Sequence, residues 1–133
     1  MRRNDQNQGG RSMSRKKIYI SGKMGEKVLS NETKRKFENA QNLLVKKGWA
    51  VINPASDVFQ KDAVKHVRIE EKKGWEEISE KPFNWYAWTL LWDMHCLCVC
   101  DAIYMLRDWE ESPGATTEYY FAKAAGLEII FEE

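Results

Sequence analysis

The sequence predicts an α/β fold built on a doubly wound sheet of four to five mostly parallel strands, with helices on both faces. Three observations support this prediction. Short apolar segments alternate with segments of helical periodicity, turn-forming residues separate them, and 133 residues give room for one domain. Because crossovers between parallel strands are right-handed, we expect a strand order near 2-1-3-4.

Two strands and one helix are predicted in the first part of the chain. The apolar run at residues 17–21 is typical of a buried strand. Apolar residues at three- and four-residue spacing then predict an amphipathic helix, which Asn31 caps and Gly48 ends. Residues 50–52 predict a second strand, which stops because the proline that follows has no backbone N–H to donate.

The next segment, residues 57–84, differs in kind because it is dense in Lys, Glu and Asp with isolated apolar residues. We expect a short helix or a mobile excursion here, and not a core strand. From Trp85 to about Leu97 the residues are apolar nearly all round. This pattern predicts a helix that the sheet or another subunit buries on most faces.

The remaining elements complete the alternation. A third strand is predicted at residues 99–106, interrupted by Asp101, and a loop at 107–113 follows it. A helix at 115–125 and a last strand at 128–131 end the fold.

Ligands of a doubly wound sheet bind outside the carboxyl ends of its strands. We therefore expect the site in the loops that follow the first three strands, at residues 21–25, 53–57 and 107–117.

The charge distribution separates a basic arm from a folded body. The whole chain has a net charge of +1, but residues 1–17 hold six basic side chains and one acid. Residues 1–14 contain no aromatic or branched aliphatic side chain, so we expect residues 1–16 to form a disordered arm and residues 17–133 to form the domain. The arm is either a solvated tail or a segment that binds an anionic partner weakly.

Composition excludes several classes of protein. A net charge near zero argues against a dedicated nucleic-acid-binding protein. No segment approaches the ~20 consecutive apolar residues that span a membrane, and no apolar run follows the first arginines as in a secretory signal. Three cysteines within residues 96–100 make no disulfide framework, which favours the cytoplasm.

The first loop contains Gly22 and Gly25, which let backbone N–H groups approach a phosphate or a sugar closely. The loop is neither a Walker motif nor a GxGxxG motif, and an ordinary tight turn explains it equally well.

The acidic residues near the start of the 115–125 helix and in the elements before it indicate a site more strongly than the first loop does. Ser112 precedes the 115–125 helix and can cap it, Gly114 leaves space for an anion at the helix start, and Glu118 lies about one turn inside. Glu118 alone would be explained by compensation of the helix dipole. However, Asp93 and Asp101 fall in predicted buried elements, and two converging carboxylates are what cleavage of a glycosidic bond needs. Asp101 has an alternative role, in which it accepts backbone N–H bonds from a loop.

Two other features have ordinary explanations. His95 and the three cysteines are spaced unlike a structural zinc site, and no second ligand pair is evident, so we expect no metal. The tryptophans of the 85–97 helix exceed what a small core needs. They are core residues, a base-stacking surface or a subunit interface.

Four groups of residues together form the pattern of a known family. They are Tyr19-Ile-Ser-Gly, Asn53-Pro54, Asp93 with Asp101, and Ser112-x-Gly114-Ala-x-x-Glu118. Over residues 17–131 the chain resembles the nucleoside 2-deoxyribosyltransferase superfamily, in particular its short phage and bacterial branch. It is similar in layout to the 2'-deoxynucleoside 5'-phosphate N-hydrolases.

This resemblance implies a flavodoxin- or Rossmann-like sheet and cleavage of the N-glycosidic bond of deoxynucleosides or their 5'-monophosphates, without a metal or another cofactor. It implies that Glu118 is the nucleophile, that Asp93 assists at the sugar or base, and that Tyr19 lies near both. Ser112 and Gly114, with Gly22, match the wall that holds the 5'-hydroxyl or phosphate. The 57–84 excursion matches no motif of the family.

The residues expected to bind substrate lie in the three loops and beside them. They are Ser21, Gly22, Lys23, Met24, Asn53, Asp101, Trp109, Ser112 and Gly114. The expected partner is a small nucleoside or nucleotide, with no specific nucleic acid and no membrane, in a homodimer or a higher even homo-oligomer. The alternative function is a module that binds a nucleotide or a nucleotide-derived signal without cleaving it.

Overall fold

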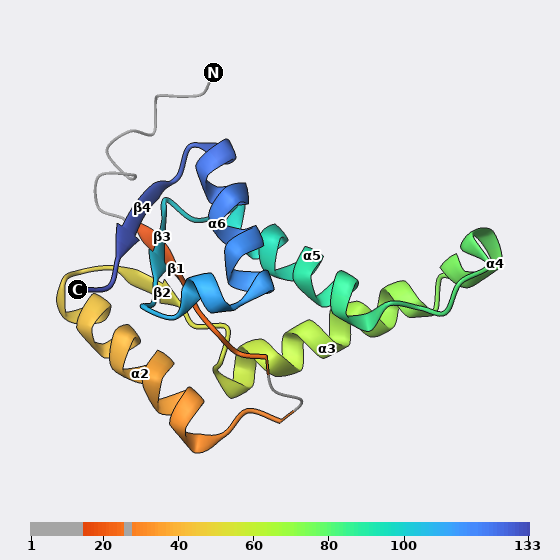
Figure 1. Ribbon diagram of the computed structural model, residues 1–133, viewed down its shortest axis with the longest axis horizontal. Helices are drawn as coiled ribbons and strands as arrows, with labels where there is room; N and C mark the ends of the chain where they lie inside the picture. The colour runs from red at the N-terminus through yellow and green to blue at the C-terminus, as the bar shows by residue number, and fades with distance from the viewer. Residues whose placement is uncertain (1–14, 26–27) are drawn as a thin grey trace.

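The computed structural model describes residues 15–25 and 28–133. Residues 1–14 of the predicted basic arm lie outside this part of the chain. A four-stranded sheet forms the centre of the fold, with β1 (Lys17–Ser21), β2 (Ala50–Ile52), β3 (Ala102–Met105) and β4 (Glu128–Phe131) (Figure 1). Every strand pair is parallel and the order is β2-β1-β3-β4. Both the α/β doubly wound fold and the strand order predicted from the sequence are confirmed.

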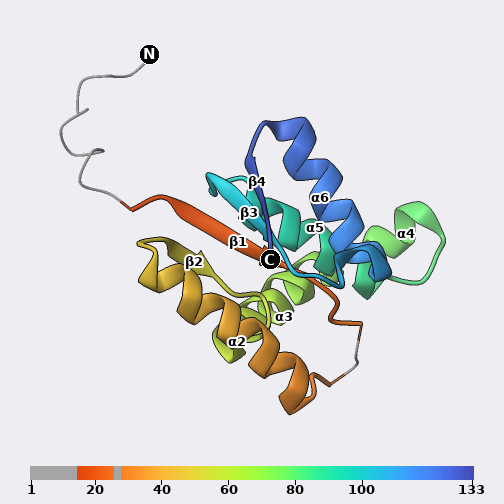
Figure 2. The same cartoon turned by 60° about the vertical axis from the view of Figure 1, so that its left-hand side comes forward.

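The two faces of the sheet carry different helices (Figure 2). Ile18 and Ile20 of β1 join a core cluster with Phe37 and Leu44 of α2 (Asn31–Lys46). Tyr19, between them, joins a second cluster on the opposite face, which includes residues of α5 (Trp85–Leu97) and α6 (Pro113–Ala125). This alternation follows from the two-residue period of a strand.

The N-cap of the first helix lies one residue earlier than the sequence predicted. Ser30, and not Asn31, is the N-cap, because its backbone is extended and its side chain accepts the N–H of Thr33 at 3.1 Å. Asn31 is already the first helical residue. Gly48 follows the helix with φ of 97°, as expected of a residue that ends it.

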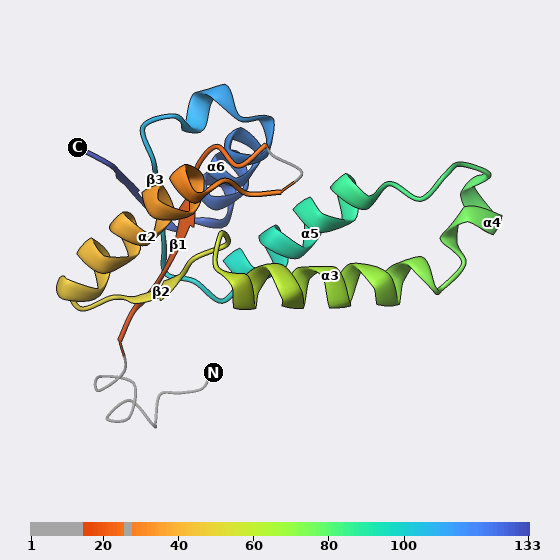
Figure 3. The ribbon, with the colours of Figure 1, turned by 90° about the horizontal axis from the view of Figure 1, so that it is seen from below.

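The charged excursion is neither short nor irregular. It forms α3 (Asp57–Glu71) and α4 (Trp75–Ser79), and α3 runs beside α5 away from the sheet, with α4 at the far end (Figure 3). We call α3, α4 and α5 the helical arm. Ring contacts stabilise its end, where Trp88 stacks on Trp75 and on Phe83, each at 5.9 Å between ring centroids.

The sheet does not bury α5 on most faces, contrary to one of the two sequence alternatives. Tyr86 is 61% exposed and Leu91 is 51% exposed, because α5 packs on α3 and α6 and leaves part of its surface free. None of the helices in the described part of the chain has the length and apolar character needed to cross a membrane.

The third strand is shorter than predicted, and this moves Asp101. The strand begins at Ala102, so Asp101 precedes it instead of interrupting it. Its carboxylate accepts the backbone N–H of Lys17 at 2.8 Å, at the amino ends of β1 and β3. The loop that follows β3 contains a short 3-10 helix, η1 (Trp109–Glu111), and α6 begins with Pro113, two residues earlier than expected.

Position 22 requires glycine because its backbone packs closely against the side chain of Leu106. A Cβ atom at this position would lie 2.6 Å from Cδ1 and 2.9 Å from Cβ of Leu106. We expect Gly22→Ala to lower the free energy of unfolding by about 1–3 kcal/mol, because the buried Leu106 has little room to move. Urea denaturation measures this loss.

The same experiment has an internal control. A Cβ at Gly25 would meet nothing within 4 Å, so Gly25→Ala should change stability little. Combining Gly22→Ala with Leu106→Ala should cost less than the sum of the two single losses, because the second change removes the close contacts with Cδ1 and Cγ and leaves only the one with Cβ. Strict additivity would contradict this explanation.

Candidate active site

The centre of the site is the side chain of Glu118, in α6, which is only 5% exposed. The hydroxyl of Tyr19 donates to its Oε2 at 2.8 Å, and the hydroxyl of Ser21 donates to its Oε1 at 2.6 Å. Tyr19 and Ser21 are two residues apart on β1, so both side chains point to the face that α6 covers. Strand geometry therefore supplies one donor to each oxygen of a single buried carboxylate.

Asp93 of α5 adds a second buried carboxyl group. It is 8% exposed and shares a hydrogen bond with Glu118. Burial, followed by the neighbouring charge of Glu118, raises the pKa of Asp93 to about 9. Burial also raises the pKa of Glu118, while hydrogen bonds from Ser21, Tyr19 and Asp93 counteract part of this rise. Asp93 is therefore protonated at neutral pH and places a proton beside the buried carboxyl group of Glu118.

Tyr19 stays protonated over the same range. Burial and then the charge of Glu118 raise the pKa of Tyr19 well above its ordinary value. It therefore acts as a fixed hydrogen-bond donor and not as a base.

The carboxyl pair opens into a cleft of about 470 Å³, a size typical of small-molecule sites. Its walls are the loop after β1, the start of α6, and the sides of α3 and α5. Seven residues predicted from the sequence line it: Gly22, Lys23, Met24, Asp93, Ser112, Gly114 and Glu118. Tyr19 and Ser21 lie behind Glu118 and hold it from the sheet side.

The start of α6 shapes one wall. Ser112 caps the helix by accepting the N–H of Ala115 at 3.1 Å, which confirms its predicted capping role. A Cβ on Gly114 would lie 3.1 Å from the hydroxyl oxygen of Tyr86. Glycine at this position lets Tyr86 of α5 approach the helix closely.

An ionic network joins the two loops that form the cleft. The ammonium of Lys36, from α2, donates to the Lys23 carbonyl at 3.0 Å and to Oδ2 of Asp108 at 2.5 Å. Asp108 also accepts the N–H of Lys23 at 3.0 Å. Burial raises the pKa of Asp108, but the hydrogen bonds from Lys36 and Lys23 outweigh it and lower that pKa overall. The loop after β1 is thus tied to the loop after β3.

Three residues predicted to bind substrate lie elsewhere. Asn53 bonds to the side chain of Gln41 and to the N–H of Ala55, each at 2.9 Å, so its amide stabilises a turn. Asp101 lies at the amino ends of the strands, as described above. Trp109 packs on Tyr119, with 4.6 Å between ring centroids, and belongs to the core.

The sequence prediction missed the part of the cleft that the helical arm supplies. Gln60 of α3 and three residues of α5, namely Tyr86, Thr89 and Leu90, line the cleft together with Asp93. Those three precede Asp93 by seven, four and three residues, which is the spacing of one helix face. This spacing could have predicted that the three residues line the site with Asp93, but the strong apolar character of the whole segment obscured it.

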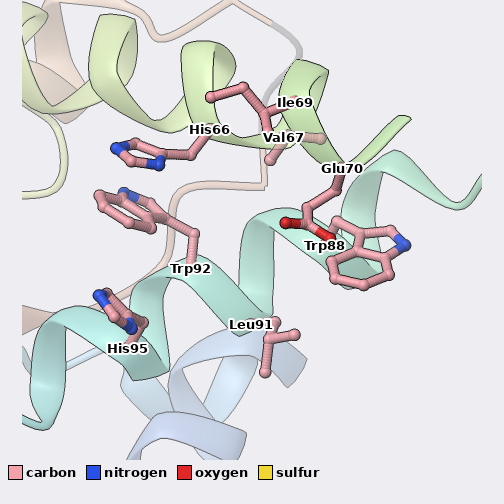
Figure 4. Close-up of a pocket in the computed structure, with 8 residues that line it drawn as sticks. All are labelled: His66, Val67, Ile69, Glu70, Trp88, Leu91, Trp92 and His95. Atoms are coloured by element: carbon pink, nitrogen blue, oxygen red, sulfur yellow. The ribbon is translucent and has the colours of Figure 1, made fainter. Parts of the chain in front are cut away.

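A second cavity, of about 340 Å³, lies between α3 and α5 (Figure 4). The ring of Trp92 is stacked between His66, at 4.0 Å, and His95, at 5.1 Å. The indole nitrogen of Trp92 is buried and has no hydrogen-bond partner in the described part of the chain. Within that part, no three His, Cys, Asp or Glu side chains are grouped so as to hold a metal ion.

Comparison with known proteins places the chain in a family. A family model described as Domain of unknown function (DUF4406) matches residues 16–131, and the chain therefore belongs to this family. No curated protein and no solved structure matches the chain.

The carboxyl pair makes a prediction about stability and pH. Because folding raises the pKa of Asp93 to about 9, the native state keeps a proton that the unfolded chain releases at much lower pH. The stabilisation is complete below the unfolded pKa and is lost as pH rises towards 9. Between pH 5 and 8 the wild-type protein should lose at least about 1 kcal/mol relative to Asp93→Asn.

Urea denaturation of both proteins at both pH values measures the difference. An equal pH dependence of the two proteins would show that Asp93 is ionised in the native state.

Proposed function

We propose that this member of the DUF4406 family cleaves the N-glycosidic bond of a small nucleoside or nucleoside 5'-monophosphate, by hydrolysis or by transfer of the deoxyribosyl group. The observation that carries the proposal is the buried carboxyl pair of Glu118 and Asp93 at the wall of a cleft. A nucleophile and a proton donor are the two groups that glycosidic cleavage needs.

Glu118 is the nucleophile in this proposal. Its carboxylate attacks C1' of the sugar, the bond from C1' to the base nitrogen breaks, and a glycosyl ester forms. The donors Tyr19 and Ser21 fix the orientation of the carboxylate, and their hydrogen bonds counteract part of the rise in its pKa that burial causes. Orientation of this kind removes much of the entropic barrier to attack.

Asp93 supplies the proton. As a neutral acid it gives its proton to the base nitrogen that leaves with the electron pair of the broken bond. The resulting carboxylate then accepts a proton from water, or from an incoming base, as that molecule attacks C1' and releases Glu118. The same group serves as acid and then as base, as in retaining glycosidases.

The sequence motifs support the same assignment. The Ser112-x-Gly114-Ala-x-x-Glu118 spacing and Asp93 resemble the pattern of the nucleoside 2-deoxyribosyltransferase superfamily, and these four residues line one cleft. Exposed apolar side chains on α5, such as Leu91, support the predicted homo-oligomer.

The first test removes the nucleophile. Purified protein is incubated with each deoxynucleoside and each 5'-monophosphate, and free base is measured by chromatography. Glu118→Gln should reduce base release by at least ~10³-fold, because the amide is a poor nucleophile of nearly the same shape. The matched control Glu38→Gln removes an exposed carboxylate on α2 and should leave the rate unchanged.

Base release that does not depend on Glu118 would overturn the proposal. Ligand that stays bound and intact after long incubation would favour the alternative, a binding module without catalysis.

The second test concerns the proton donor. Base release by the wild-type protein should fall above pH of about 9, where Asp93 loses its proton. Asp93→Asn should be slow at every pH and lack this decline, because the amide has no acidic proton. Rates measured from pH 5 to 10 with both proteins check this, and a decline of the same shape in the variant would contradict the role of Asp93.

A further inference from the structure

The solvent face of α3 carries a continuous row of cations. Lys61, Lys65, Arg68 and Lys72 follow one another at spacings of four, three and four residues, and all are exposed. Residues at these spacings share one helix face. We call these four residues the basic row. Figure 3 shows that α3 runs the length of the helical arm, so the row follows that arm away from the sheet.

The basic row has no counterions of its own. No residue that the structure describes forms a salt bridge with any of the four side chains. Three of the four acids of the same helix are engaged elsewhere: Asp57 pairs with Lys34, Glu70 bonds to Lys73 and Trp75, and Glu71 accepts the indole N–H of Trp85. The fourth acid, Asp62, leaves the row with a net positive charge of three. Like charges at these spacings destabilise a helix, so an external anion bound along the row would stabilise it.

The length of the basic row indicates the kind of anion. Eleven residues of α-helix separate its ends, which corresponds to ~16 Å. The row also borders a shallow depression of about 610 Å³, with Val64 and Ile69 between the charges. A single small anion would engage one or two of these side chains, whereas a linear polyanion engages all four.

A nucleic-acid strand fits this surface better than a membrane does. Val64 and Ile69 are the exposed apolar side chains between the charges, and helices that lie in a bilayer interface bury a wide face of larger residues. Beyond Lys72 the chain reaches Trp75, which stacks on Trp88 with one side of its ring and is still 41% exposed. Cations along a backbone path combined with aromatic rings are typical of proteins that bind single strands without sequence preference.

We propose that the basic row binds the phosphodiester backbone of single-stranded nucleic acid, without reading its sequence. This goes beyond the cleavage of small nucleosides and does not depend on it, because none of the four side chains lines the cleft. A net charge of +1 for the whole chain is compatible with such binding, because the positive charge is concentrated locally.

The experiment measures fluorescence anisotropy of a labelled oligothymidylate of about 20 nucleotides, at salt concentrations from about 50 to 200 mM. The full chain is compared with a variant in which Lys61, Lys65, Arg68 and Lys72 are all changed to Gln. A second variant, with Arg35, Lys46, Lys47 and Lys123 changed to Gln, loses the same charge from other exposed sites. Circular dichroism verifies that both variants fold.

We expect the variant of the basic row to lose at least about tenfold in affinity, and its plot of log affinity against log salt to become shallower by about 3, since four phosphate contacts are lost. The charge-matched variant should stay within about twofold of the wild-type protein.

Equal losses in the two variants would overturn the proposal by attributing binding to overall charge. The same holds if the wild-type protein fails to bind at low salt, or binds phosphatidylserine vesicles and not the oligonucleotide. Glu118→Gln should bind the strand as the wild-type protein does, so failure of the proposed catalysis and failure of this proposal give different results.

Discussion

The structure depends on one interaction, the burial of the Glu118 carboxylate against β1 and α5. An isolated buried carboxylate is prohibitively costly, so its surroundings must supply donors. Tyr19 and Ser21 supply two from the central strand, and Asp93 supplies a third by remaining protonated. Three segments far apart in the sequence must therefore meet within hydrogen-bond distance. The parallel order β2-β1-β3-β4 allows this, because it brings α5 and α6 to the same face of β1.

The helical arm gives this buried pair a binding site. Without α3 and α5 the carboxylate of Glu118 would lack its partner Asp93 and would be open to water, which screens its interactions. With these helices in place, Gln60 and Tyr86 close one side of the cleft, and the loop after β1 closes another. The network of Lys36, Lys23 and Asp108 fixes the second wall to the rest of the fold. One side of the cleft is thus built on helices and the other on two tied loops.

The sequence predicted those parts of the site that depend on local pattern. Alternation along β1 places Tyr19 and Ser21 on one face, and a cap at Ser112 places Glu118 one turn inside α6. Asn53 lies away from the cleft because its amide bonds to Gln41, a residue of another element that no local pattern reveals. Asp101 lies away from the cleft because it directly precedes β3, at the amino ends of the strands, whereas the cleft lies at their carboxyl ends.

The helical arm was the hardest part to predict for a related reason. The buried face of α3 is narrow, and only Ala63 and Val67 are buried along it, so charged residues dominate the local composition. The partner surface that completes this face is α5, which follows more than ten residues later. A helix stabilised mainly by packing against another helix shows its own amphipathic pattern only weakly.

The chemistry of the buried pair also indicates why these residues belong to a functional site. Apolar residues of similar volume in place of a buried ionic pair often leave a protein equally or more stable. At positions 93 and 118 the fold instead buries two acids that repel each other unless they share a proton. It also commits two hydroxyl groups of its central strand to them. A core that served stability alone would need none of these groups, whereas a site that must supply both a nucleophile and a proton needs all of them.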